Sequence, residues 1–211
     1  MLGLLGAGVE AQLTLVAAPP GYGKTTAVQT WCASQDRPVV WLTLDSGDND
    51  PVRLWTYVAT AIDRVRAGAG RVALQRLRAS RGPIEDPIDE LLNRTASLPG
   101  GVLVVLDDCH EVAQPDALRS VEYALNHLPP KVSVIMLTRT DPAVGLARMR
   151  ARGTVAEVRA ADLAFTLEET RELVVDRHGV ELDTDEIVGL WERTEGWPAA
   201  IYLAALWLRG R

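Results

Sequence analysis

The chain has 211 residues, of which 47% are hydrophobic and 24% charged, a composition typical of a soluble globular protein with a sizeable core. Its formal net charge of −6 disfavours direct binding to nucleic acid, which depends on neutralising phosphate groups. No apolar run approaches the ~20 residues of a membrane span, and Met1 to Glu10 lacks the basic and apolar regions of a signal peptide. We therefore expect a cytoplasmic protein with no membrane partner, in which Cys32 and Cys109 are reduced thiols.

Most of the chain predicts strands that alternate with helices. Strands are expected at Gln12–Ala18, Pro38–Leu44, Val102–Leu106, Val132–Leu137 and Thr154–Val158. Helices are expected at Lys24–Ser34, Arg53–Arg66, Asp86–Ser97 and Ala117–Leu128, whereas residues 67–82, which are rich in glycine and arginine, are expected to be irregular. The runs VLVVL and VSVIML do not alternate, which is typical of parallel strands buried on both faces. The predicted fold class is therefore α/β, with a doubly wound parallel sheet of about five strands.

After about residue 162 the pattern changes to helices only. Capping boxes predict that helices begin after Thr166 and Asp183. Within the segment EGWPAA, Gly196 suits the left-handed end of one helix and Pro198 suits the first turn of the next. The expected domains are an α/β nucleotide-binding domain of residues 1–160 and a small helical subdomain, or lid, of residues 161–211.

The segment APPGYGKTT follows a predicted strand and precedes a predicted helix, which is the context of a Walker A phosphate-binding loop. Gly21 and Gly23 would let backbone N–H groups turn toward phosphate oxygens at the positive end of the helix dipole. Lys24 can reach the β- and γ-phosphates as a compact charge, and Thr25 offers a hydroxyl to Mg²⁺. The pattern GxxxxGK[ST] departs at its first position, Ala18, and an ordinary turn is the alternative. The predicted residues of the ATP or ADP site in this P-loop NTPase fold are Ala18, Pro19, Pro20, Gly21, Tyr22, Gly23, Lys24, Thr25 and Thr26.

Charged residues follow two of the buried strands. After VLVVL, Asp107 is placed to hold Mg²⁺ through water, and Asp108 could act as a general base on the attacking water. The alternative is that both carboxylates cap a turn. After VSVIML, Arg139 is expected to contact a γ-phosphate, because strand ends of this kind lie beside the phosphates. The alternative is a solvated arginine that pairs with Asp141.

Together these segments resemble the nucleotide-binding module of large LuxR-type transcriptional regulators similar to the maltose-operon activator, within the STAND class of P-loop ATPases. The segments that carry the resemblance are LTLVAAPPGYGKTT, VVWLTLDSGDNDPVRLWTYV, VLVVLDDCHEV, VIMLTRTDP, LAFTLEET and EGWPAAIYLAAL. The resemblance covers nearly the whole chain, from about Gln12 to Leu208, and the Gly-Trp-Pro element makes it more specific than a Walker A loop alone.

The resemblance implies a longer regulator, in which DNA binding is expected only through a C-terminal domain absent from this chain. It also implies a switch. The resting protein holds ADP as a monomer, exchange for ATP drives self-association of the full-length protein, and slow Mg²⁺-dependent hydrolysis resets it. Applied to this sequence, it implies that Lys24 and Thr25 bind phosphate and Mg²⁺ and that Arg139 senses the γ-phosphate. It also implies that Asp107 holds Mg²⁺ and that Asp108 assists hydrolysis, while Pro198 touches the base or the sugar.

Two other functions use similar features. A small-molecule P-loop kinase has the same loop, but it usually closes an arginine-rich lid, whereas the last fifty residues here are acidic. An interaction module could hold ADP structurally without turnover, and Asp108 argues weakly against that function. From its residues, the sequence predicts a nucleotide site with Mg²⁺, in which the adjacent carboxylates favour hydrolysis.

Other polar and aromatic residues leave alternatives open. His110 could orient Asp108 or make a structural hydrogen bond. The acidic residues of DSGDND could bind a metal, although a turn that caps the next helix is the favoured interpretation; they are Asp45, Asp48 and Asp50. Three tryptophans fall on apolar faces and are expected in the core: Trp41, Trp55 and Trp207.

Overall fold

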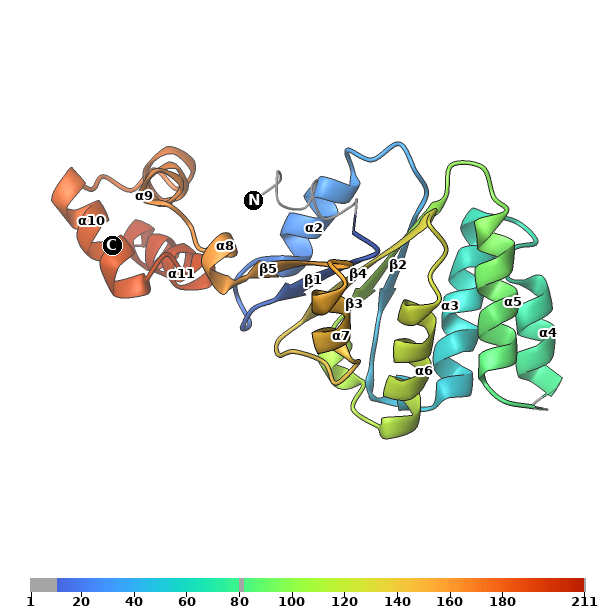
Figure 1. The fold of residues 1–211 in the computed structure, drawn as a ribbon. Helices are drawn as coiled ribbons and strands as arrows, with labels where there is room; N and C mark the ends of the chain where they lie inside the picture. The colour runs from blue at the N-terminus through green and yellow to red at the C-terminus, as the bar shows by residue number, and fades with distance from the viewer. Residues whose placement is uncertain (1–10, 80–81, 211) are drawn as a thin grey trace.

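The computed structural model describes residues 11–79 and 82–210, so the segment Met1–Glu10 lies outside the described residues. A five-stranded, fully parallel sheet forms the centre of the fold, with strand order β2-β3-β4-β1-β5 (Figure 1). The strands are β1 (Leu13–Ala17), β2 (Val39–Thr43), β3 (Val102–Asp107), β4 (Val132–Thr138) and β5 (Val155–Arg159). The predicted parallel sheet of about five strands is confirmed.

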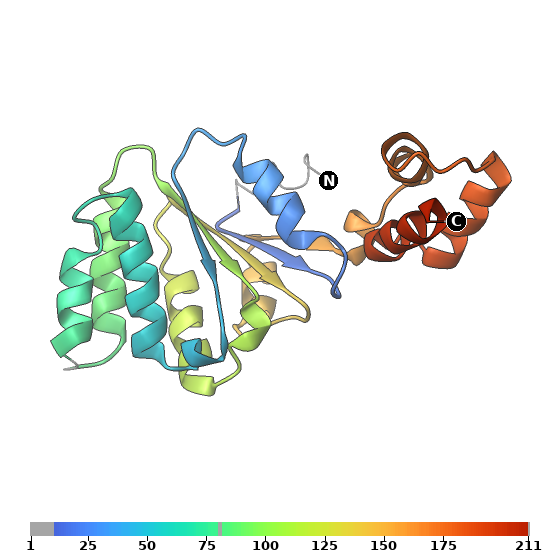
Figure 2. The ribbon, with the colours of Figure 1, turned by 180° about the vertical axis from the view of Figure 1, so that it is seen from behind.

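Helices cover both faces of this sheet (Figure 2). Helix α2 lies on one face, whereas α3, α5, α6 and α7 lie on the other, and α4 packs beside α3 and α5. The doubly wound arrangement is therefore confirmed. The helical elements of this part are α2 (Lys24–Cys32), η1 (Ser46–Asn49), α3 (Pro51–Val65), α4 (Arg71–Ala79), α5 (Glu85–Ala96), η2 (Cys109–Glu111), α6 (Pro115–Asn126) and α7 (Leu146–Ala151).

The strands are apolar on both faces because each face meets a different helical layer. In β3, Leu103 and Val105 pack toward α2, whereas Val104 and Leu106 pack toward the opposite helices. Successive side chains of a strand point to opposite faces, so only a continuous apolar run can fill both layers. This packing holds the carboxyl ends of the strands in fixed positions relative to one another.

Helix α4 corrects one prediction from the sequence. Residues 67–82 were expected to be irregular, yet Arg71–Ala79 is helical. Ala73 and Leu77, which lie four residues apart on one face of the helix, are buried against α3 and α5. The arginines that suggested an irregular segment occupy the solvated side of this helix, where long basic side chains are favourable.

The chain beyond β5 forms a group of short helical elements beside the edge of the sheet (Figure 1). They are α8 (Ala160–Leu163), α9 (Leu167–Arg171), the π-helical segment η3 (Glu172–Arg177), α10 (Thr184–Thr194) and α11 (Pro198–Arg209). Both predicted capping boxes are present, at Thr166 and Asp183. A small separate core includes Val174 and Ile201. The division of the chain into two domains at residue 160 stays a prediction.

The three tryptophans expected in the core differ in their burial. Trp55 is buried, and its indole N–H donates to the Ser120 hydroxyl at 2.9 Å. Trp41 is half-buried against the α2 side of the sheet. Trp207 is 58% exposed, so the prediction for this residue was wrong. Apolar residues surround most of α11, and their spacing therefore did not indicate which face of the helix packs inward.

Two expectations from composition concern membranes and thiols. Within residues 11–79 and 82–210, no helix combines the length and apolar character needed to cross a bilayer. Cys32 and Cys109 are free thiols. Burial raises the pKa of Cys32 to about 11, so its reactive thiolate is scarce at neutral pH.

The break in EGWPAA is formed as the sequence predicted. Gly196 has φ +71°, and Pro198 occupies the first turn of α11. The Gly196 carbonyl accepts a hydrogen bond from the Phe165 N–H at 2.8 Å. A β-carbon on Gly196 would lie 2.5 Å from the Phe165 carbonyl oxygen, so this backbone contact requires glycine.

Gly196→Ala should therefore destabilise the helices beyond residue 160. A side chain in the left-handed region costs about 1–2 kcal/mol before any steric clash is counted. We expect amide hydrogen exchange to increase in residues 161–210 while the strands of the sheet stay protected.

Gly189→Ala is the matched control, because a β-carbon on this glycine of α10 meets nothing within 4 Å. Alanine stabilises a helix interior by about 0.5–1 kcal/mol relative to glycine. Equal exchange in the two variants would contradict the role assigned to Gly196.

Candidate nucleotide-binding site

The phosphate loop has the backbone that an anion site needs. Gly21 and Gly23 both have positive φ, +81° and +71°, as the Walker A prediction requires. Gly23 is the N-cap of α2 and supplies no side-chain cap, and the first turn of the helix carries no acidic residue. The amide groups of that turn are therefore available to a phosphate, where the helix dipole also favours negative charge.

Lys24 lies across the mouth of this loop. Its Nζ donates to the carbonyl oxygens of Ala18 at 2.8 Å and Pro19 at 3.1 Å. Burial lowers the pKa of Lys24, and the positive charge of Arg139 lowers it further, whereas Asp107 and Asp108 raise it. One positive and two negative side chains thus act on this ammonium group.

Asp107 and Thr25 meet beside the loop. The Thr25 hydroxyl donates to Asp107 Oδ2 at 3.0 Å, and the Asp108 N–H donates to Asp107 Oδ1 at 2.9 Å. Asp107 is only 5% exposed. A hydroxyl and a buried carboxylate at this separation are hard oxygen ligands that fit Mg²⁺, which usually takes one or two protein ligands together with phosphate and water. In the described part of the chain, no cluster of three or more His, Cys, Asp or Glu side chains could hold a metal by itself.

Asp108 lies next to this pair in a strained conformation. Its φ is +55°, a left-handed value that is uncommon for residues other than glycine. Its carboxylate is 46% exposed. His110 Nδ1 lies 3.8 Å from Asp108 Oδ1, beyond hydrogen-bonding distance, and His110 Nε2 lies 3.4 Å from the Glu111 carboxylate. The histidine ring therefore packs beside Asp108 without forming a hydrogen bond to it.

Arg139 follows β4, the strand that lies between β1 and β3. The phosphate loop follows β1 and Asp107 ends β3, so the topology places Arg139 between these two parts of the site. Arg139 is exposed. Among the described residues, the ion pairs of Asp141 go to Arg150 and Arg159 rather than to Arg139, so the alternative pairing considered from the sequence is wrong.

The helical subdomain contacts the phosphate loop directly. The Trp197 indole N–H donates to the Pro20 carbonyl at 3.2 Å, and the Ala199 N–H donates to the Gly21 carbonyl at 3.1 Å. A β-carbon on Gly21 would lie 2.7 Å from both Ala199 Cβ and Trp197 Nε1. The Gly-Trp-Pro element thus packs on the loop directly over Gly21. Any larger residue at position 21 would displace this element.

A cleft of about 400 Å³ opens between α2 and this subdomain. Pro198 lines it, which is where the resemblance expected a contact with base or sugar. The other lining residues are Tyr22, Gly23, Thr26, Ala27, Thr30, Leu163, Phe165, Leu173, Ala199 and Tyr202. Apart from Tyr22, Gly23 and Thr26 of the loop, sequence reasoning missed these residues. For Tyr202 a signal was present, because it lies four residues after Pro198 on the same face of α11.

The acidic segment near β2 forms a turn, as the favoured interpretation predicted. Asp45 and Asp48 make a reciprocal capping box on η1, and Asp50 caps α3. Arg53 reaches back to Asp45 at 2.9 Å and Asp48 at 3.4 Å. These carboxylates are occupied by the turn and by one arginine.

Comparisons with known proteins agree with this geometry. No protein-family model matches the chain. The HTH-type transcriptional regulator MalT of Cronobacter sakazakii is 29% identical over 98% of the chain, and MalT of Vibrio cholerae is 32% identical over 92%. The chain spans 23% and 22% of the lengths of these two relatives.

A solved structure shares the fold. The STAND ATPase with a tetratricopeptide repeat sensor from Pyrococcus horikoshii superposes with a TM-score of 0.65 at 19% identity, covering 93% of this chain and 28% of that one. The P-loop fold, the site geometry and the MalT relatives lead to the same assignment. Over 92–98% of its length the chain is similar to MalT transcriptional regulators of the LuxR type, and its fold is that of a P-loop ATPase.

Proposed function

We propose that this chain is an ATP/ADP-binding switch whose nucleotide state controls self-association of a full-length cytoplasmic regulator, with DNA bound by another domain of that protein. The observation that carries this proposal is the contact of Trp197 and Ala199 with the carbonyls of the phosphate loop. Because the helical subdomain is hydrogen-bonded to the backbone of the phosphate loop, a conformational change in the loop alters the contacts that position the subdomain.

In this proposal, the phosphate groups replace the carbonyls that now hold Lys24. The ammonium group turns from Ala18 and Pro19 toward the β- and γ-phosphates, and the amides of the first turn of α2 bind phosphate oxygens. Thr25 and Asp107 would hold Mg²⁺, which neutralises charge on the phosphates. The stronger charge of a triphosphate compensates for the positive field of Arg139 on Lys24.

Asp108 is proposed to accept the proton of the attacking water. Its carboxylate is half-exposed, and its backbone N–H donates to the Asp107 carboxylate, so the side chain can reach a water in front of the phosphates. Arg139, from the neighbouring strand end, would contact the γ-phosphate and distinguish ATP from ADP. Slow turnover then resets the switch.

The apolar cleft is proposed to take the base and the sugar. Pro198 presents a ring without an N–H, and Phe165 and Tyr202 offer aromatic surface in the same cleft. A bound nucleotide would then join α2 to the subdomain at a second place, in addition to the hydrogen bonds on the phosphate loop.

Lys24→Ala should strongly weaken the binding of ADP and ATP, because the loop keeps its shape but loses the charge that faces the phosphates. Hydrogen bonds to charged groups contribute about 1.5–3 kcal/mol each, so affinity should fall at least about tenfold. Isothermal titration calorimetry measures this effect. Lys131→Ala, at the only other lysine of the chain and exposed in the turn before β4, should bind as the parent does.

Asp108→Asn should reduce ATP hydrolysis about 10²–10⁴-fold while nucleotide affinity is retained, because an amide cannot accept the proton. Asp107→Asn is the comparison variant, and it should weaken binding only when Mg²⁺ is present. Phosphate release under single-turnover conditions measures the step. Equal hydrolysis by the parent and Asp108→Asn would contradict the role of Asp108, and a parent that binds ATP without any turnover would favour a module that only holds ADP.

Binding of ADP should protect residues 195–207 together with residues 18–26 in hydrogen exchange, since both segments line the cleft or contact the loop. The edge strand β2 is separated from β1 by β3 and β4, so its hydrogen exchange should be unaffected. Protection limited to residues 18–26 would show that the base does not occupy the cleft.

A further inference from the structure

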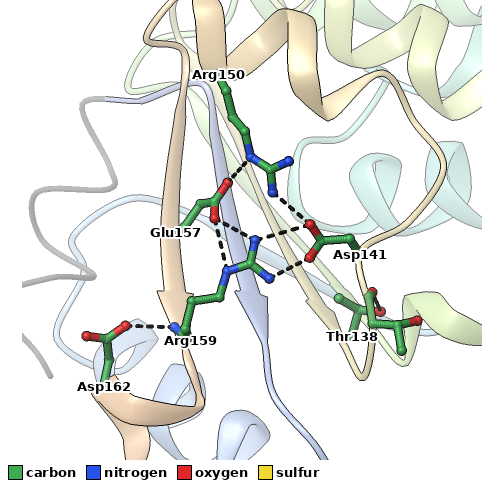
Figure 3. A network of polar contacts seen from close by, with 7 residues as sticks. Thr138, Asp141, Arg150, Glu157, Arg159 and Asp162 are labelled. Atoms are coloured by element: carbon green, nitrogen blue, oxygen red, sulfur yellow. Dashed lines mark hydrogen bonds and ion pairs between the residues drawn. The ribbon is translucent and has the colours of Figure 1, made fainter.

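Four charged side chains form a closed network beside β5 (Figure 3). Asp141 is bonded to Arg159 Nη1 at 2.5 Å and to Arg150 Nη2 at 2.7 Å. Glu157 is bonded to the same two arginines, each at 2.5 Å. Because Val158 packs toward α2, its neighbours on β5 point to the opposite face of the sheet.

Asp141 belongs to the loop that carries Arg139. It lies two residues beyond Arg139 and three residues after the last residue of β4, Thr138. The Thr138 hydroxyl donates to the Thr140 carbonyl at 2.7 Å and closes a turn around the arginine. The backbone at Arg139 is therefore fixed on one side by this turn and on the other by the bonds of Asp141.

Arg159 belongs to the connection with the helical subdomain. It is the last residue of β5, and its N–H donates to Asp162 Oδ2 at 2.8 Å at the start of α8. In the register of the sheet, Ala17 of β1 pairs with Thr138 of β4 on one side and with Arg159 of β5 on the other. The Asp141–Arg159 pair therefore links the two strands that flank β1, at the level where the phosphate loop begins.

This network is better suited to fixing geometry than to adding stability. The side chains of Asp141, Arg150 and Arg159 are 37–41% exposed, and exposed ion pairs contribute little stability. The hydrogen bonds from Arg159 and Arg150 lower the pKa of Asp141 to about 2, so the carboxylate is ionised at neutral pH. Planar guanidinium groups that each bridge two carboxylates hold those groups at fixed positions.

We propose that Asp141 is a positioning residue for Arg139, and that its bonds to Arg159 couple the loop that senses the γ-phosphate to the helical subdomain. The proposal rests on the proposed function, because it needs Arg139 to contact the γ-phosphate. Binding of ATP fixes the position of Arg139 and of the loop that carries Asp141. Through its ion pair with Asp141, Arg159 at the end of β5 is held in place, and with it the start of α8.

The test compares ATP and ADP affinities of the parent, Asp141→Asn, Arg159→Gln, Arg139→Ala and the double variant Arg139→Ala/Asp141→Asn. Asp141→Asn and Arg159→Gln should each lower ATP affinity about tenfold and leave ADP affinity unchanged, since Arg139 meets only the third phosphate. In the Arg139→Ala background, Asp141→Asn should have no further effect. Asp116→Asn breaks an exposed pair with Arg119 on α6 and should change neither affinity.

Hydrogen exchange at residues 160–166 gives a second readout. It should differ between the ATP and ADP complexes of the parent, and this difference should disappear in Asp141→Asn. Equal loss of ATP and ADP affinity in Asp141→Asn would show a merely structural role and overturn the inference, as would an additive effect in the double variant. A parent that binds neither nucleotide would instead contradict the proposed function, so the two failures can be told apart.

Discussion

Two hydrogen bonds from the helical subdomain end on carbonyls of the phosphate loop, and the rest of the site depends on them. The Trp197 indole and the Ala199 N–H reach Pro20 and Gly21 only because position 21 has no side chain. The same positive φ at Gly21 turns the loop into an anion-binding shape. The backbone proposed to receive phosphate is thus also the backbone that seats the subdomain, so a change in one should alter the other.

The charges around Lys24 would favour a bound anion at the loop. Its ammonium group is partly buried, is repelled by Arg139 and is bonded to two neutral carbonyls. Asp107 and Asp108 attract it from the other side. A phosphate in the proposed site would offer negative charge to Lys24 and Arg139 together and would relieve the repulsion that the carbonyls leave in place. The strained backbone of Asp108 lies at the edge of this same field, where strain often marks a functional residue.

Much of this fold could be predicted from the sequence because its signals are local. The buried strands are continuous apolar runs, the phosphate loop is nine consecutive residues, and the capping boxes each occupy four. Helix α4 was missed because only Ala73 and Leu77 mark its buried face, among many arginines. Trp207 was misplaced because α11 carries apolar residues on both its packed and its exposed sides.

The cleft could not be predicted in the same way, since its walls come from distant parts of the chain. Phe165, Leu173 and Tyr202 meet Tyr22 and Thr30 only after the subdomain is seated on the loop. The spacing of residues within one segment cannot indicate contacts between such distant segments. The charged network has the same origin, because Asp141 and Arg159 are 18 residues apart and are brought together by the pairing of β4 and β5 with β1.

The charged network and the phosphate loop differ in which basic residue suits them. The chain has 22 basic residues, and the two that bridge the network, Arg150 and Arg159, each contact two carboxylates through different nitrogens of one planar group. A lysine ammonium has no such fork and would leave one carboxylate without a fixed partner. At Lys24 the requirement is reversed, because a small charge on a flexible stem can exchange loop carbonyls for phosphate oxygens within the same space. The rigid cations therefore lie where two carboxylates are held in place, and the flexible one lies where the proposed site would receive a phosphate.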